Sequence, residues 1–175
     1  MPGAVRRNPI VVALLFAVSG VITFLLLRTW NPGFYLGGIT FGLLAGFLFV
    51  RFKKFWPVIV LQMDLVWMAA WRSAVFLIVD WRWNAYLGMM VAGVIGGLGV
   101  AASSGVGRRE LLAVRYLAIL AAVGAIAALP FGWWEQKNSD SPLLWCFAIW
   151  QSVVGVTLWA CNSRLVSLPD KAPDL

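Results

Sequence analysis

The sequence predicts an all-α polytopic membrane protein with six transmembrane helices, arranged as three consecutive helical hairpins. Three observations support this fold class. Of the 175 residues, 62% are hydrophobic and only 12% are charged, which lies outside the range of soluble globular domains. The apolar residues form long runs separated by short polar or turn-rich segments. Lys, Arg and Trp residues gather at the ends of these runs, as is typical of helices that cross a bilayer.

Each of the six apolar runs can cross a hydrocarbon core of roughly 30 Å, given some tilt or local thinning for the shorter ones. Between the runs lie segments rich in Gly, Pro, Asn, Ser or charged residues, as expected of turns. The predicted spans cover about residues 9–27, 34–50, 57–79, 86–102, 111–130 and 143–160. We therefore expect residues 1–161 to form one bundle and residues 162–175 to form a short cytoplasmic tail.

Two of these spans need a separate justification. The first follows Arg6 and Arg7, like the apolar part of a secretory signal, but no small-x-small cleavage site follows it and further spans do. We expect it to be a retained helix. The third contains both Asp64 and Arg72, so it is the least regular of the six, and Arg72 could instead mark a break.

Glycines recur with one spacing in the second and fourth spans. The two sets are related by a constant offset of 51 residues, which leaves open whether the hairpins are true internal repeats. Small residues at such spacing let membrane helices approach closely. The predicted helix-packing residues are Gly37, Gly42, Gly46, Gly88, Gly93 and Gly97.

The distribution of Lys and Arg predicts the orientation of the chain. With six spans both termini lie on one side, and that side carries ten Lys and Arg residues against four on the other. Short loops rich in Lys and Arg stay in the cytoplasm. We therefore expect both termini in the cytoplasm of a multi-pass cell-membrane protein, most simply of a bacterial inner membrane.

Several function classes are excluded by what the sequence lacks. It has no histidine, which removes the commonest zinc ligand, the usual axial ligand of haem and the base of most hydrolytic triads. It has no phosphate-binding loop of the Walker type. The net charge of +7 comes from residues at the ends of the apolar runs, so it indicates topology and lipid contact rather than nucleic acid. We expect no catalytic residue, metal or cofactor.

One polar group inside the membrane stands out. Asp64 is the only acidic residue well inside a predicted span, and an intramembrane acid needs a partner, water or a function. At 100° per residue Trp67 and Trp71 share its helix face. Arg72 lies roughly 12 Å further along the axis, so a direct bond to Asp64 would be strained. We expect Arg115, from the fifth span, to pair with Asp64.

These residues are compatible with two kinds of site. The first is a buried ion pair with hydrogen bonds that only fixes helix packing. The second is a polar site beside aromatic walls that binds a small solute, a lipid headgroup or a proton. The candidate residues for such a site are Asp64, Trp67, Trp71, Arg72, Arg115 and Gln151.

Three functions follow from these predictions. The first is a non-enzymatic subunit or assembly factor of a membrane complex, or a homo-oligomer, with membrane lipids and a membrane-protein partner or a second copy around it. The second is a small-solute transporter, or a component of one, that binds its ligand near the third span. The third is a lipid-modifying membrane enzyme. No motif in the chain identifies a family.

Overall fold

The computed structural model describes residues 8–29, 37–49, 56–106, 109–137 and 141–166. The described chain is helical and contains no strand, so the all-α prediction is confirmed. The elements, in chain order, are α1 (Pro9–Thr29), α2 (Gly37–Phe49), α3 (Trp56–Val75), the π-helix η4 (Phe76–Asp80), α4 (Ala85–Gly105), the 3-10 helix η5 (Arg109–Leu112), α5 (Val114–Ala127), α6 (Leu129–Lys137) and α7 (Ser141–Val166).

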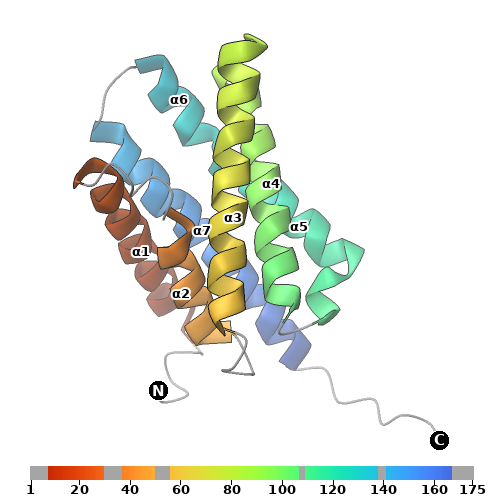
Figure 1. Ribbon diagram of the computed structural model, residues 1–175. Helices are drawn as coiled ribbons and strands as arrows, with labels where there is room; N and C mark the ends of the chain where they lie inside the picture. Colours follow the sequence, from red (N-terminus) through yellow and green to blue (C-terminus); the bar gives the residue numbers. More distant parts are fainter. Residues whose placement is uncertain (1–7, 30–36, 50–55, 107–108, 138–140, 167–175) are drawn as a thin grey trace, which may run out of the picture.

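The helices form one ring in which neighbours in the chain are also neighbours in space (Figure 1). From α1 to α5 each helix packs against the next, α5 packs against α7, and α1 closes the ring against α7. The most extensive contacts join α1 to α7 and α4 to α5. The grouping into three hairpins therefore stays a prediction.

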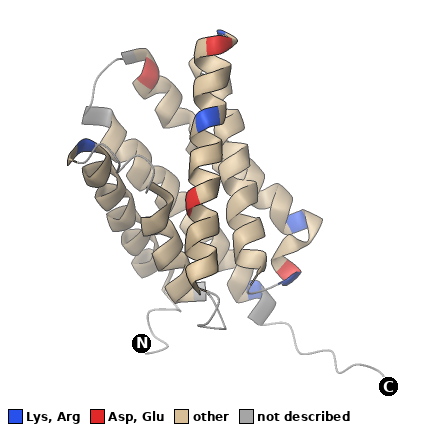
Figure 2. Cartoon of the chain, viewed as in Figure 1, with Lys and Arg blue, Asp and Glu red and all other residues tan. Residues whose placement is uncertain are grey.

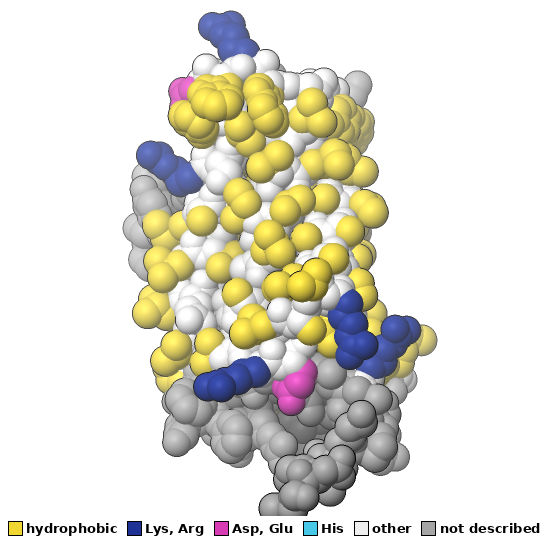
Figure 3. All heavy atoms as spheres, turned by 90° about the vertical axis from the view of Figure 1, so that its right-hand side faces the viewer, with side chains coloured by type: hydrophobic (Ala, Val, Ile, Leu, Met, Phe, Trp, Pro, Cys, Tyr) yellow, Lys and Arg dark blue, Asp and Glu magenta, His cyan; other side chains and the backbone are white. Residues whose placement is uncertain are grey.

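The outer surface of the bundle is apolar. On α1 a stripe of large hydrophobic side chains at helical spacing is exposed: Ile10, Leu14, Val18, Ile22 and Leu25. Figure 3 shows hydrophobic side chains over the height of another face, and Figure 2 shows most charged residues toward the ends of the helices. Five helical stretches are long and apolar enough to cross a membrane, and α2 is a shorter apolar helix. This is the pattern of a multi-pass membrane protein.

The described residues include only part of the predicted second span. Within the described residues α2 has 13 residues, or roughly 20 Å at 1.5 Å per residue, against the 20 or so residues that a span needs. Residues 34–36 and 50 of the predicted span lie outside the described residues. Gly38 of α2 lies against Met63 and Asp64, and Gly46 lies against Trp56. The described part of α2 therefore covers only the first half of α3.

The helical chain continues past Pro130, where the fifth span is predicted to end. The chain breaks at Ala128, whose N–H contacts the carbonyl oxygens of Gly124 and Ala125, and a new helix α6 begins at Leu129. Pro130 is the second residue of that helix, where the missing N–H has no intrahelical partner to lose. Together α5 and α6 form one apolar stretch from Val114 to Gln136, so most of the predicted loop after Pro130 is helical.

Two further boundaries differ from the prediction. Arg72 causes no break, because α3 continues to Val75 and then widens into η4. The last helix extends beyond residue 160 to Val166, so the first part of the predicted tail is helical, and residues 167–175 lie outside the described residues. An apolar run predicts the part of a helix that lies inside the membrane, but it does not predict the polar last turn of that helix.

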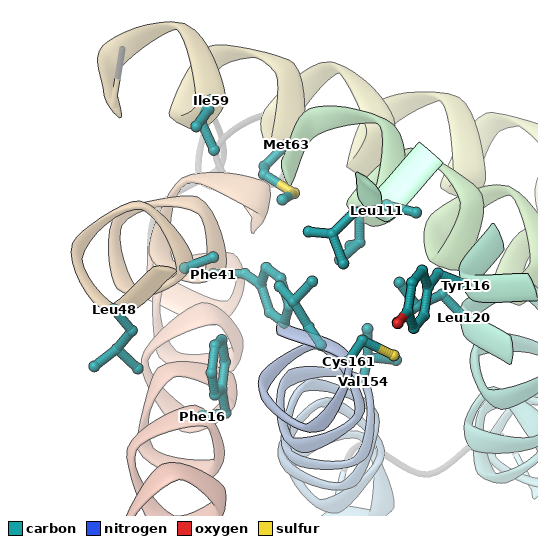
Figure 4. Close-up of a cluster of buried hydrophobic side chains, with 14 of the residues drawn as sticks. Phe16, Phe41, Leu48, Ile59, Met63, Leu111, Tyr116, Leu120, Val154 and Cys161 are labelled. Atoms are coloured by element: carbon teal, nitrogen blue, oxygen red, sulfur yellow. The ribbon is translucent and has the colours of Figure 1, made fainter. Parts of the chain in front are cut away.

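Two clusters of buried hydrophobic side chains form the core. The first includes Phe16, Phe41, Met63, Leu120 and Val154, and Figure 4 shows its side chains converging from α1, α2, α3, α5 and α7. The second lies toward the other end of the bundle and includes Phe24, Ala74, Met89, Phe131 and Phe147. The region between the two clusters holds the polar residues described below.

Glycines allow the closest helix contacts. Gly93 and Gly97 of α4 lie against the backbone of α5, where a Cβ atom would overlap the carbonyl oxygens of Gly124 and Leu120. The other predicted packing glycines also lie against side chains or backbone of α3 or η4: Gly37 at Trp67, Gly42 at Val60 and Met63, Gly46 at Trp56, and Gly88 at Ile78.

Candidate functional site

A cavity lies inside the ring, between the two hydrophobic clusters. Its volume is about 60 Å³, and it opens to the outside of the bundle. Its walls come from α2, α3, α4, α6 and α7 and from Ala128. The lining residues are Gly37, Gly38, Phe41, Met63, Val66, Trp67, Ala70, Trp71, Ala74, Met89, Ala92, Gly93, Gly96, Val100, Ala128, Phe131, Trp150 and Gln151. None of these side chains is ionisable.

Aromatic rings form opposite walls of the cavity. On α3 the rings of Trp67 and Trp71 are stacked, with centroids 6.1 Å apart and planes 23° apart. On α7 the indole of Trp150 contacts the ring of Phe41 at 5.9 Å between centroids. Its Nε1–H donates to the carbonyl oxygen of Gly124 at 3.3 Å, which fixes the indole between α5 and α7.

The cavity exists because small residues face these indoles. A Cβ atom at Gly96 would lie 2.8 Å from the Trp150 ring, so only glycine leaves room for that ring beside α4. Ala70 and Ala92 extend the lining on α3 and α4 with methyl groups. Large rigid rings hold the helices apart, and the small residues between them do not fill the space.

Gln151 is a buried polar residue among those that line the cavity. This side chain is 1% exposed, and its Nε2 donates to the hydroxyl oxygen of Thr23 at 2.9 Å. The Thr23 hydroxyl in turn contacts the carbonyl oxygens of Ser19 at 3.1 Å and Gly37 at 3.3 Å, and the hydroxyl of Thr40. A buried hydrogen-bond network therefore joins α1, α2 and α7 at the cavity wall.

Asp64 is buried at 8% exposure and binds a helix end instead of a side chain. Its Oδ1 accepts a hydrogen bond from the backbone N–H of Gly38 at 3.2 Å. Gly38 is the second residue of α2, and the first N–H groups of a helix have no partner within the helix. The absent side chain of Gly38 lets α2 approach α3 closely. A carboxylate here also interacts favourably with the positive end of the helix dipole.

The expected ion pair between Asp64 and Arg115 is wrong. Arg115 is exposed on α5, and its guanidinium lies over the ring of the adjacent Tyr116, 4.6 Å from the centroid. The hydrogen bond from the N–H of Gly38 to Asp64 joins α2 to α3, away from α5. Arg72 is also exposed and does not line the cavity, in keeping with a long side chain that extends toward the nearer interface.

Some of the predicted site residues therefore lie at the cavity and others do not. Trp67, Trp71 and Gln151 line the cavity, and Asp64 lies behind its wall through Gly38. The sequence missed the small lining residues, because an absent side chain gives no signal of its own. It also missed Thr23, although a lone threonine in an apolar run was a possible signal for an interhelical hydrogen bond.

No family model, curated protein or solved structure matched the chain. The function must therefore follow from the geometry. Within the described ranges no group of three or more His, Cys, Asp or Glu side chains lies close enough to hold a metal ion. The cavity offers apolar contact and aromatic faces. Such a lining suits binding of a neutral molecule.

Proposed function

We propose that this chain is a membrane-embedded binding protein, a small-solute transporter or a component of one, which holds a small neutral ligand in the cavity. The observation that carries the proposal is an almost wholly apolar space lined by the stacked indoles of Trp67 and Trp71 and by the indole of Trp150. Binding pockets for small molecules are mostly apolar concavities with few polar groups.

A subunit or self-associating bundle is less well supported. That prediction depended on short loops, the absence of a catalytic constellation, and glycine faces on the second and fourth helices that suit helix contact. Gly42 and Gly46 face α3, and Gly93 and Gly97 face α5, so these close-packing positions are used within the chain. A membrane-protein partner stays a prediction with no surface assigned to it.

Binding of phenol to the purified chain in lipid nanodiscs tests the proposed function. Ala70 lines the cavity, so Ala70→Leu places three more carbon atoms in the binding space, and we expect it to lower the affinity at least about tenfold. The neighbouring Ala69 is exposed, so Ala69→Leu is the matched control and should bind like the wild type. Equal saturable binding by all three proteins, or none by the wild type, would contradict the proposal.

For the orientation we propose that both termini are cytoplasmic, as the Lys and Arg count predicts. The start of α1 and the end of α7 lie at the same end of the bundle (Figure 1). Trp81 and Glu110 are exposed near opposite ends of α4. In intact cells an impermeant maleimide should label Trp81→Cys but not Glu110→Cys. The natural cysteines, Cys146 and Cys161, are buried and should stay unlabelled. The reverse pattern would overturn the orientation.

A further inference from the structure

We infer that the ligand of the cavity is a compact non-polar ring molecule that carries no hydrogen-bonding group. This inference depends on the proposed binding function and adds the chemical class of the ligand. Two observations carry it. The described lining of the cavity is almost wholly apolar, and the polar groups beside it are hydrogen-bonded or buried within the wall.

Two side chains of the lining direct their polar atoms into the wall. The Nε2 atom of Gln151 donates to the hydroxyl of Thr23, and the Oε1 atom of the same amide is buried. The indole N–H of Trp150 donates to the carbonyl oxygen of Gly124. These two side chains therefore present mainly carbon atoms to the cavity, in agreement with its almost wholly apolar lining.

The start of α2 is also part of the lining, through Gly37 and Gly38. The first N–H groups of a helix have no partner within the helix and could bind a polar ligand. Here the N–H of Gly38 donates to Oδ1 of Asp64 at 3.2 Å. The carbonyl oxygen of Gly37 lies within hydrogen-bond distance of the Thr23 hydroxyl. These two backbone groups are therefore already paired.

The apolar lining selects against polar ligands. A hydroxyl or amide group would lose its hydrogen bonds to water on entry and would gain none in return. A charged group would lose more, because none of the lining side chains is ionisable. A non-polar molecule has no such loss, and its binding removes apolar surface from water. Apolar protein cavities stay free of water and bind molecules such as benzene.

The size and the aromatic walls of the cavity favour a single ring. The volume is about 60 Å³. A cavity needs about 10–15 Å³ to hold one water molecule, so this space corresponds to roughly four to six of them. The bonded atoms of one carbon ring overlap and occupy a space of this order. The indoles of Trp67, Trp71 and Trp150 line it, and aromatic rings in offset or edge-to-face contact gain more than simple burial.

Toluene and phenol test the inference, because they have nearly the same shape and differ in a methyl group against a hydroxyl. Each is titrated against the wild type in nanodiscs, with Ala70→Leu as the background for partition into lipid and Ala69→Leu as the exposed-site control. We expect toluene to bind the wild type and Ala69→Leu at least about tenfold more tightly than phenol, because the phenol hydroxyl finds no partner in the cavity.

The two possible failures are distinct. If phenol binds the wild type as tightly as toluene or more tightly, and Ala70→Leu weakens both, the cavity binds ligands but the inferred chemical class is wrong. If neither compound binds above the background, the proposed function itself fails, and a lipid chain that fills the cavity would give this second result. Should Ala70→Leu not fold, nanodiscs without protein supply the background.

Discussion

Gly97→Ala is expected to destabilise the bundle by about 3 kcal/mol, the upper part of the range for overpacking. A Cβ atom at this position would overlap the carbonyl oxygen of Leu120. That oxygen belongs to the backbone of α5 and cannot move aside like the end of a side chain, so α4 and α5 must separate. The free energy of unfolding, from titration with SDS in mixed micelles followed by circular dichroism, measures the effect.

Gly46→Ala is the matched control. It is also a glycine-to-alanine change in a predicted packing glycine, but its Cβ would meet the Cβ of Trp56 at 3.5 Å, an ordinary contact. Alanine is the better helix former by up to about 1 kcal/mol, so this variant should be neutral or slightly more stable. Equal destabilisation by both changes would show that the effect of Gly97→Ala does not come from the close approach of α4 and α5.

Asp64→Leu should be the second strong change, with a loss of about 2 kcal/mol. It leaves the N–H of Gly38 buried without an acceptor at the start of α2. Asp64→Asn keeps an oxygen that accepts the hydrogen bond, so it should lose less than Asp64→Leu. Thermal unfolding of the three proteins in the same detergent gives the order.

Arg115→Leu separates this account from an ion pair between Asp64 and Arg115. Because Arg115 is exposed and contacts the ring of Tyr116, its loss should change the stability by no more than about 0.5 kcal/mol. An ion pair would instead make both single changes costly, and the double change would recover part of the loss. That pattern would contradict the hydrogen bond from Gly38 as the main partner of Asp64.

The helical class can be predicted from the sequence because long apolar runs indicate membrane spans. Backbone polar groups must be paired inside the bilayer, and an α-helix pairs them within one span. The sequence does not predict the break at Ala128 and the new helix from Leu129, since proline ends a helix in one setting and begins one in another. An apolar run shows that a segment suits lipid or a core and does not show where its helix starts.

The sequence predicts those site residues that lie together on one face of a single helix. Trp67 and Trp71 follow from the spacing along α3, and both line the cavity. The partner of Asp64 did not follow, because a helical face does not identify the neighbouring helix and a backbone N–H has no side-chain signature. The cavity also depends on which small residues face which indoles, as Gly96 faces Trp150, and that is a property of the assembled ring.

Mass spectrometry of small molecules extracted with the purified protein shows whether the cavity holds a ligand. The wild type, Ala70→Leu and Ala69→Leu would be expressed in the same cells and purified in parallel. We predict that one class of small neutral molecule accompanies the wild type and the exposed-site control in near-equal amounts and is depleted in Ala70→Leu. The same small molecules in all three proteins, in equal amounts, would contradict a binding cavity between α3, α4 and α7.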